Sequence, residues 1–444
     1  MFLTALNKNL KEKILSVLNH QGFRRYSINT AWLFSEQILR MVAGFFVGVW
    51  VARYLGPEKF GIFSYALAFV SIFQGIAKLG LDGILVRDLV KEPEKKDIYL
   101  GTSFWLKFFA GIIIFIIVLI VSYFASDNLQ TFIYINIISA GLIFQSFEVI
   151  DFYYQATVQA KYISIRKMIQ LFLSSSIKLI FILVKADLIW FVLVTLFDSI
   201  SLAVFSWLIY KSQRLPNFIK YFELNTAKRL LKDSWPLVFS SIAIAVYMRI
   251  DQVMIKNLLG DREVGLYSAA VKLVEVWYFI PMIITQSLFP AIVSKYNDKP
   301  EFFRRLVILS AVMGYIGLFI SIILSLSSYF IIKMLYGEKF LDAAPILSIA
   351  SFIIFISFWM SGVSRRQAID MQKLALFATI LSAVANIILN FIFIPIYGVR
   401  GAALVSVLNQ FIAGPFFAFF HPKARENFYI AFKGLILPFK WFKI

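Results

Sequence analysis

The chain has no cysteine and only two histidines among its 444 residues. The absence of cysteine excludes disulfides and thiolate metal sites, and His20 and His421 both lie outside the apolar runs of the sequence. We therefore expect no metal site and no cofactor. Acidic residues are also scarce, with 25 Asp and Glu against 44 Lys and Arg, which gives a formal net charge of +19. In a soluble protein this excess would suggest a nucleic-acid partner.

Apolar residues make up 60% of the chain and are gathered into long runs. At about 1.5 Å per residue, a helix of roughly 20 apolar residues crosses a hydrocarbon layer about 30 Å thick. The runs predict twelve membrane helices, at residues 29–52, 60–81, 102–124, 131–150, 167–185, 187–209, 236–258, 265–289, 304–326, 345–362, 373–394 and 401–420. Residues 328–342 are predicted to form a loop, because polar residues from Tyr336 to Lys339 interrupt the pattern.

The basic residues predict the orientation of these helices. Thirty of the 44 Lys and Arg residues lie in the two termini and in the loops on the same side as them, whereas eight lie in the loops of the other side. Because positively charged loops remain in the cytoplasm, both termini are expected to be cytoplasmic. A membrane location also accounts for the positive charge without a nucleic-acid partner. No cleavable signal peptide is predicted, because residues 1–28 lack a continuous apolar core.

The expected domains follow from this topology. They are a cytoplasmic interfacial segment at 1–28, a first six-helix bundle at 29–210, a cytoplasmic linker at 211–235, a second six-helix bundle at 236–420 and a basic interfacial tail at 421–444. The tail is too basic, and too broken at Pro438, to predict a span, and a remnant of a further helix is the alternative.

A sequence repeat relates the two predicted bundles. The segment from Leu55 to Ala66 (LGPEKFGIFSYA) matches the segment from Leu259 to Ala270 (LGDREVGLYSAA) at a constant offset of 204 residues. Both segments occupy the hairpin between the first two helices of a bundle, where glycine suits a positive φ and a close helix approach. Two parallel six-helix halves are typical of transporters, with a substrate cavity between them. We therefore predict an all-α integral membrane protein with this architecture around a central cavity.

Charged residues near the middle of the predicted helices define the candidate site. They are Glu36, Arg40, Lys178, Asp198, Arg249, Asp251, Lys272 and Glu275. A charge at the centre of a bilayer costs about 2.5–3.5 kcal/mol on insertion scales, so each one requires a reason. The four basic residues predict a cationic cavity for an anion such as a pyrophosphate, because guanidinium groups bind two phosphate oxygens at once. The four acidic residues would balance this charge or carry a coupling ion. Salt bridges between helices are the alternative.

Other charged residues lie near the predicted helix ends. Arg53 is placed at the outer mouth, where it would contact the substrate, contact lipid headgroups or only set the topology. Lys78 and Lys107 are expected to extend toward the cytoplasmic surface. Glu148 and Asp151 are interpreted as a solvated helix end.

Several motifs resemble one membrane-protein family. The stretch Arg249-Ile250-Asp251-Gln252-Val253-Met254, followed by Leu259-Gly260 and Gly265-Leu266-Tyr267-Ser268-Ala269-Ala270, resembles the seventh and eighth helices of polysaccharide biosynthesis exporters. The segment Ile284-Thr285-Gln286-Ser287-Leu288-Phe289-Pro290 resembles them too. The segments Tyr336-Gly337-Glu338-Lys339-Phe340 and Pro395-Ile396-Tyr397-Gly398-Val399-Arg400-Gly401 have the same character. The order of the motifs, over about residues 20–420, is most similar to the Wzx-type O-antigen flippases of the multidrug/oligosaccharidyl-lipid/polysaccharide exporter superfamily.

The resemblance implies transport of an undecaprenyl-pyrophosphate-linked oligosaccharide from the cytoplasmic to the periplasmic leaflet of the bacterial inner membrane. It implies alternating access, coupling to a proton or sodium gradient and, as further partners, the lipid bilayer and polysaccharide assembly enzymes. Arg40, Arg249 and Lys272 would contact the pyrophosphate, and Lys178 matches less closely.

Four other functions remain as alternatives. A lipid II flippase for peptidoglycan, a relative in the same superfamily, commonly has two extra helices, which this chain lacks unless the tail inserts. A multidrug or organic-cation antiporter of the same superfamily would need an acidic or aromatic pocket, whereas basic residues here match or outweigh the acids. A membrane polymerase or ligase would need a larger outer loop with catalytic groups, so no enzyme is expected. A non-transporting scaffold would have no use for charges within the membrane.

Overall fold

The computed structural model describes residues 21–370 and 372–436. Within these residues the chain is helical and contains no β-strand, which confirms the predicted all-α class. Long apolar runs become helices in a membrane because a helix pairs its backbone N–H and C=O groups within its own segment.

Ten helical segments of the described chain are long and apolar enough to cross a membrane. One of them, Ser27–Lys91, contains both of the first two predicted helices. The helix α7 (Ala160–Leu183), predicted as a span at 167–185, is not among the ten, and it carries Arg166, Lys167 and Lys178. The chain is a multi-pass membrane protein, and the count of twelve spans stays a prediction.

The chain divides into two compact units, each of which is described by itself. Unit 1 contains the described residues up to Val47, together with Ile76–Ala125 and Asn136–Val238. Unit 2 contains Gly48–Gly75, Ser126–Ile135 and the described residues from Phe239 onward. Three helices pass from one unit into the other, namely α2 (Gln21–Ala77), α5 (Leu129–Phe144) and α9 (Leu224–Leu259).

The other elements of unit 1 gather around an aromatic core. They are α3 (Asp82–Lys91), η1 (Pro93–Lys95), α4 (Lys96–Ala125), η2 (Gln145–Glu148), α6 (Val149–Ala156), α7, α8 (Leu188–Ser212) and η3 (Phe218–Lys220). In this core Phe104, Tyr210 and Phe218 are buried, and the rings of Tyr210 and Phe218 meet edge to face at 5.1 Å. Trp105 donates its indole N–H to the carbonyl of Ile219 at 2.9 Å. The core therefore joins helix ends that the charge bias assigns to the cytoplasm.

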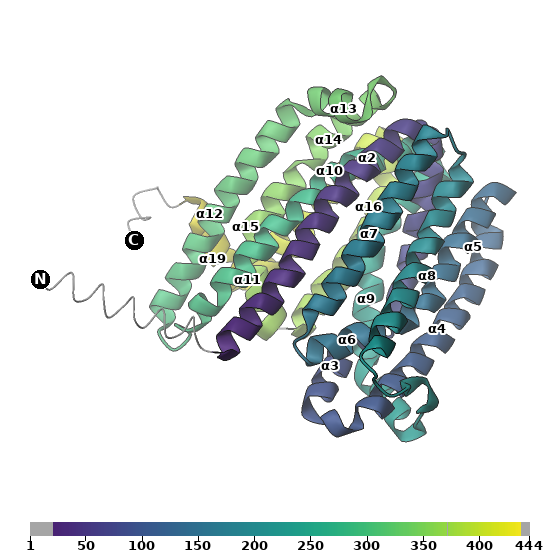
Figure 1. Cartoon of the computed structure of the whole chain (residues 1–444). Coiled ribbons are helices and arrows are strands. Elements are labelled where there is room, and N and C mark those ends of the chain that lie inside the picture. The colour runs from purple at the N-terminus through teal and green to yellow at the C-terminus, as the bar shows by residue number, and fades with distance from the viewer. Residues whose placement is uncertain (1–20, 371, 437–444) are drawn as a thin grey trace, which may run out of the picture. The chain divides into compact units, whose positions relative to one another are not determined.

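Unit 2 contains the remaining elements. They are α10 (Asp261–Glu275), η4 (Val276–Tyr278), α11 (Phe279–Val293), α12 (Lys299–Leu326), α13 (Ser328–Tyr336), η5 (Glu338–Ala343), α14 (Ala344–Ala350), α15 (Phe352–Asp370), α16 (Gln372–Tyr397), α17 (Val399–Phe411), the π-helix η6 (Ile412–Phe416), α18 (Phe417–Phe420) and α19 (Arg425–Ile436). In this unit α12 packs along both α15 and α19 (Figure 1). The helix α16 packs against α17.

The predicted loop at 328–342 is wrong. These residues form the helix α13 and the 3-10 helix η5, which are separated by Gly337 with a φ of 85°. Tyr336 is buried and donates its hydroxyl to the carbonyl of Ala269 at 3.2 Å. The polar residues interrupt the apolar pattern without ending the helical structure. Gly337 alone makes the turn between α13 and η5, and Tyr336 packs inside the unit.

The repeat is visible in the backbone of unit 2. Gly56 and Gly260 both have a positive φ, of 74° and 102°, as the turns require. A Cβ on Gly61 would come 1.7 Å from the carbonyl oxygen of Asp261, and a Cβ on Gly265 would come 1.9 Å from the carbonyl oxygen of Pro57. The two hairpins therefore contact each other reciprocally through backbone, and the predicted need for a positive φ and a close approach is confirmed.

Replacing Gly265 with alanine is expected to destabilise unit 2 by about 1–3 kcal/mol, because the added Cβ meets a backbone carbonyl that must move. Gly83→Ala is the matched control, since nothing lies within 4 Å of its added Cβ and alanine is the better helix former. Thermal unfolding of both purified variants in detergent would measure the difference. Equal midpoints for the two variants would contradict the close contact.

Candidate functional site

Four of the predicted site residues lie in unit 1, where they form two ion pairs. Arg40 donates through Nε to Oε1 of Glu36 at 2.6 Å, one helical turn earlier on α2. The Glu36 side chain is 6% exposed and that of Arg40 is 39% exposed, so the guanidinium remains accessible. Between α7 and α8, Nζ of Lys178 lies 3.2 Å from Oδ2 of Asp198. Each basic residue therefore has an acidic partner, as the salt-bridge alternative requires, and each stays partly exposed.

The predicted basic residues of unit 2 lie on the hairpin formed by α9 and α10. Nη1 of Arg249 lies 3.1 Å from Oε1 of Glu275, and both side chains are about one-third exposed, at 31% and 28%. The ammonium of Lys272 lies over Gly48 of α2, and a Cβ at Gly48 would come 1.9 Å from Nζ. The absence of a side chain at Gly48 therefore makes room for this cation.

Asp251 lies two residues after Arg249, but its surroundings differ. Its side chain is buried, and its oxygens accept hydrogen bonds from the Tyr267 hydroxyl at 2.6 Å, from Oγ of Ser406 at 3.0 Å and from Nδ2 of Asn390 at 2.9 Å. Asn390 also donates to Oδ1 of Asn386 at 2.5 Å. The network thus joins α9, α10, α16 and α17 around one carboxylate.

The composition of this network has a chemical consequence. Among the described residues, no lysine or arginine forms an ion pair with Asp251, and its hydrogen-bond partners are neutral. The Oδ1 atom of Asn390 is buried without a hydrogen-bond partner in the described part of the chain. A buried carboxylate is costly unless a positive charge or a proton compensates it. One carboxylate with neutral oxygen donors suits a proton or a small hard cation of single charge.

Arg53 is exposed on the part of α2 that belongs to unit 2. Its Nη1 lies 3.5 Å from the carbonyl oxygen of Met334 on α13, so its donor contact is a long one. A Cβ at Gly337 would come 3.6 Å from its Nε. The structure places Arg53 beside the α13–η5 turn, and its role at an outer mouth stays a prediction.

The expectations for Lys107 and Asp151 are wrong, since both residues are buried. The Lys107 side chain is 1% exposed, and its Nζ lies 3.0 Å from Glu148 and 3.6 Å from Asp82. Lys107 therefore does not extend to the surface, and Glu148 is its ion-pair partner. Asp151 accepts from Nη2 of Arg166 at 2.7 Å.

The available sequence signal for these pairs is weak. Lys107 and Glu148 are 41 residues apart, and Arg166 and Asp151 are 15 apart, so neither pair has helical spacing. Both pairs lie near helix ends, where a charge is usually solvated. Only the packing of α3, α4, α6 and α7 over these ends makes them interior.

Comparison with known proteins begins with the family models. Residues 28–296 match the family described as "Polysaccharide biosynthesis protein". The "Putative O-antigen transporter" of Shigella flexneri is 25% identical over 404 residues, which cover 85% of this chain and 93% of that protein.

Two solved structures are similar across nearly the whole chain. The structure "Lipid II flippase MurJ, inward closed conformation" has a TM-score of 0.66 at 19% identity and covers 93% of this chain and 90% of its own. An inward-facing multidrug resistance MATE family transporter of the MOP superfamily has a TM-score of 0.66 at 14% identity, with 89% and 94% covered. These likenesses show that the chain has the same fold of membrane helices as these two proteins.

Proposed function

Because this chain belongs to the polysaccharide biosynthesis protein family, we propose that it is a flippase that moves a lipid-linked oligosaccharide across the membrane. The family and the similar structures are transporters, so the polymerase or ligase alternative is set aside. We further propose that the lipid carrier of this cargo is undecaprenyl pyrophosphate. It moves from the cytoplasmic to the periplasmic leaflet of the bacterial inner membrane, where polysaccharide assembly enzymes receive it.

The observation that carries the proposal is the contrast between Arg249 and Asp251 on α9. Arg249 keeps a partly exposed guanidinium beside Glu275, which suits a planar pair of contacts to phosphate oxygens. Asp251 is buried among neutral donors, which suits a reversible proton or sodium ion. One helix thus offers both an anion contact and a cation site, as ion-coupled export of a pyrophosphate lipid requires.

The proposed mechanism assigns a step to each group. When the pyrophosphate enters, it competes with Glu275 for Arg249, while Lys272 on the same hairpin adds positive charge. The paired acids Glu36 and Asp198 neutralise their partners when no cargo is bound. Binding of a cation at Asp251 neutralises the network that joins α9, α10, α16 and α17, and so favours one packing of these helices over another.

A drug antiporter is the competing transporter function, since the MATE transporter shares the fold. The predicted site does not favour an organic cation. Each of the pairs Glu36–Arg40, Lys178–Asp198 and Arg249–Glu275 already contains a fixed cation. Each acid is thus already neutralised, so a cationic drug would have to displace a fixed cation from its acid, and Lys272 adds one further cation that favours a pyrophosphate.

The proposal is tested by the place where lipid-linked oligosaccharide collects when the protein is depleted. Lipid-linked sugars would be extracted from cells and from right-side-out spheroplasts treated with an impermeant glycosidase. We expect intact repeat units to accumulate and to stay protected from the enzyme, because translocation is the step that is lost.

The other outcomes would contradict this function. Accumulated units that the glycosidase digests have already crossed the membrane, which would place the protein after translocation. If no lipid-linked sugar accumulates, the drug-antiporter function becomes the better explanation.

A further inference from the structure

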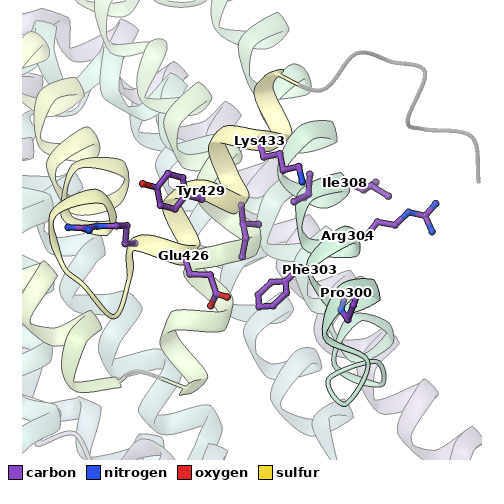
Figure 2. Close-up of a pocket in the computed structure, with 10 residues that line it drawn as sticks. Pro300, Phe303, Arg304, Ile308, Glu426, Tyr429 and Lys433 are labelled. Atoms are coloured by element: carbon purple, nitrogen blue, oxygen red, sulfur yellow. The ribbon is translucent and has the colours of Figure 1, made fainter.

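None of the charged residues of the proposed transport site lines a groove that is found in unit 2. It runs between the first turns of α12 and the helix α19 and has a volume of about 680 Å³ (Figure 2). Such a volume is within the usual range of about 300–1,000 Å³ for small-molecule sites.

The helix α19 is fixed to the unit by specific contacts, so the groove has a defined shape. Trp359 of α15 donates its indole N–H to the carbonyl of Ala431 at 2.7 Å, and Tyr315 of α12 donates its hydroxyl to the carbonyl of Leu435 at 3.0 Å. A Cβ on Gly434 would come 2.9 Å from the carbonyl oxygen of Val307, so the two helices are close at this point. Toward their first residues α12 and α19 lie further apart, and the groove opens between these two ends (Figure 2).

The walls of the groove are mostly apolar. Phe303, Val307 and Ile308 of α12 face it on one side, and Ile430 of α19 faces it on the other. Tyr429 adds an aromatic ring and is 56% exposed. A hydrocarbon chain fits these walls better than a sugar or a free anion, because the walls offer few hydrogen-bond donors.

Charged groups border these walls. Three cations, Arg304, Arg425 and Lys433, line the groove together with one carboxylate, Glu426. Figure 2 shows Lys433 extending from α19 toward α12, whereas Arg304 extends outward from α12. Arg304 is paired with Glu301 at 3.2 Å and is 52% exposed, and Lys433 forms no ion pair within the described chain. The border is thus positively charged and open to an anion.

We propose that this groove binds an anionic phospholipid of the surrounding bilayer. Its phosphate lies between Arg304 and Lys433, and one acyl chain follows Val307 and Ile308 away from the start of α12. Basic pockets between membrane helices bind anionic headgroups on the cytoplasmic side, and the charge bias assigns this end of α12 to the cytoplasm. Long basic side chains also suit this place, since they keep their stems on apolar surface and their charges at the headgroups.

Native mass spectrometry of the purified full-length protein would test the proposal, with phosphatidylglycerol and phosphatidylcholine as probes. We expect wild-type protein to retain phosphatidylglycerol at least fivefold better than phosphatidylcholine. The double variant Arg304→Gln/Lys433→Gln should lose this preference. The control Lys211→Gln/Lys423→Gln removes the same charge from two exposed lysines outside the groove and should keep it.

A second measurement locates the lipid. Since the chain has no cysteine, Phe432→Cys gives a unique thiol for a fluorophore beside the groove, and Phe319→Cys gives one on an exposed part of α12 further along. In bilayers, a spin-labelled phosphatidylglycerol should quench the first label at least twofold more than a spin-labelled phosphatidylcholine, and the second label equally with both.

Three outcomes would overturn the proposal. They are equal retention of both lipids by the wild-type protein, an unchanged preference in the Arg304/Lys433 variant, and displacement of phosphatidylglycerol by millimolar inorganic phosphate. The last result would identify a site for soluble phosphate. A variant that fails to fold would be replaced by Lys433→Glu alone, for which the same loss of preference is expected.

Discussion

Replacing Arg249 with alanine is expected to reduce transport by roughly tenfold or more while leaving membrane insertion intact. A charge-assisted hydrogen bond contributes about 1.5–3 kcal/mol, which corresponds to about 10- to 100-fold in binding. The guanidinium is about one-third exposed, so its removal leaves no fully buried hole in the helix packing. Accumulation of protected lipid-linked repeat units in cells that carry only the variant would measure the loss, and immunoblotting of membranes would measure insertion.

The Glu275→Gln variant separates a substrate contact from a structural ion pair. It removes the acidic partner, which lies 3.1 Å from Arg249, but leaves the guanidinium in place. If Arg249 binds the pyrophosphate, this variant should transport at a rate close to that of the wild-type protein. Equal impairment of both variants would show that the ion pair itself is what matters, and full activity of Arg249→Ala would remove Arg249 from the site.

Replacing Asp251 with asparagine is expected to abolish coupling to an ion gradient and to lower transport at least tenfold. The substitution keeps the size of the side chain but removes the only carboxylate among Tyr267, Asn386, Asn390 and Ser406. A neutral amide cannot compensate a cation in a buried place, so ion affinity is lost. Tyr267→Phe is the matched control, because it removes one hydrogen bond to Asp251 and keeps the charge.

Two measurements on the purified protein would identify the coupling ion. If sodium binds at Asp251, sodium chloride should raise the midpoint of thermal unfolding relative to choline chloride in the wild-type protein but not in Asp251→Asn. If a proton binds instead, sodium should have no effect, and transport into proteoliposomes should follow an imposed pH gradient only with the wild-type residue. An Asp251→Asn variant that keeps the wild-type ion dependence would exclude Asp251 as the coupling site.

The helices and the repeat could be predicted from sequence because physical limits leave few choices. The thickness of the bilayer sets the length of an apolar run, and the lack of water forces the backbone into helices. Gly56 and Gly260 were predictable as turn positions, since positive φ favours glycine, and both are observed with positive φ. The extent of α9 was not predictable, since its first residues from Leu224 are polar and look like a linker.

The candidate site was predictable only in part. A charge in an apolar run is easy to notice, so Arg249, Asp251 and Glu275 could be named. The partners of Asp251 could not, because Asn390 and Ser406 are neutral residues that lie 139 and 155 positions away in the chain. The i to i+4 pair of Glu36 and Arg40 was recognisable from spacing alone, whereas Lys107 and Glu148 depend on the packing of separate helices.

The reciprocal contact of the two glycines has the form of an isologous interface. Pro57 faces Gly265, the counterpart of Gly61, and Gly61 faces Asp261, the counterpart of Pro57. Two identical six-helix chains related by a twofold axis would form the same contact twice. The residue that supplies the carbonyl can differ between the halves, as Pro57 and Asp261 do, because every residue has a carbonyl. The residue that faces this carbonyl must be a glycine, because a Cβ would collide with it. A homodimer built from one repeated half could therefore keep this contact, while the charge of Asp251, whose counterpart at the same offset is Val47, needs two halves that differ.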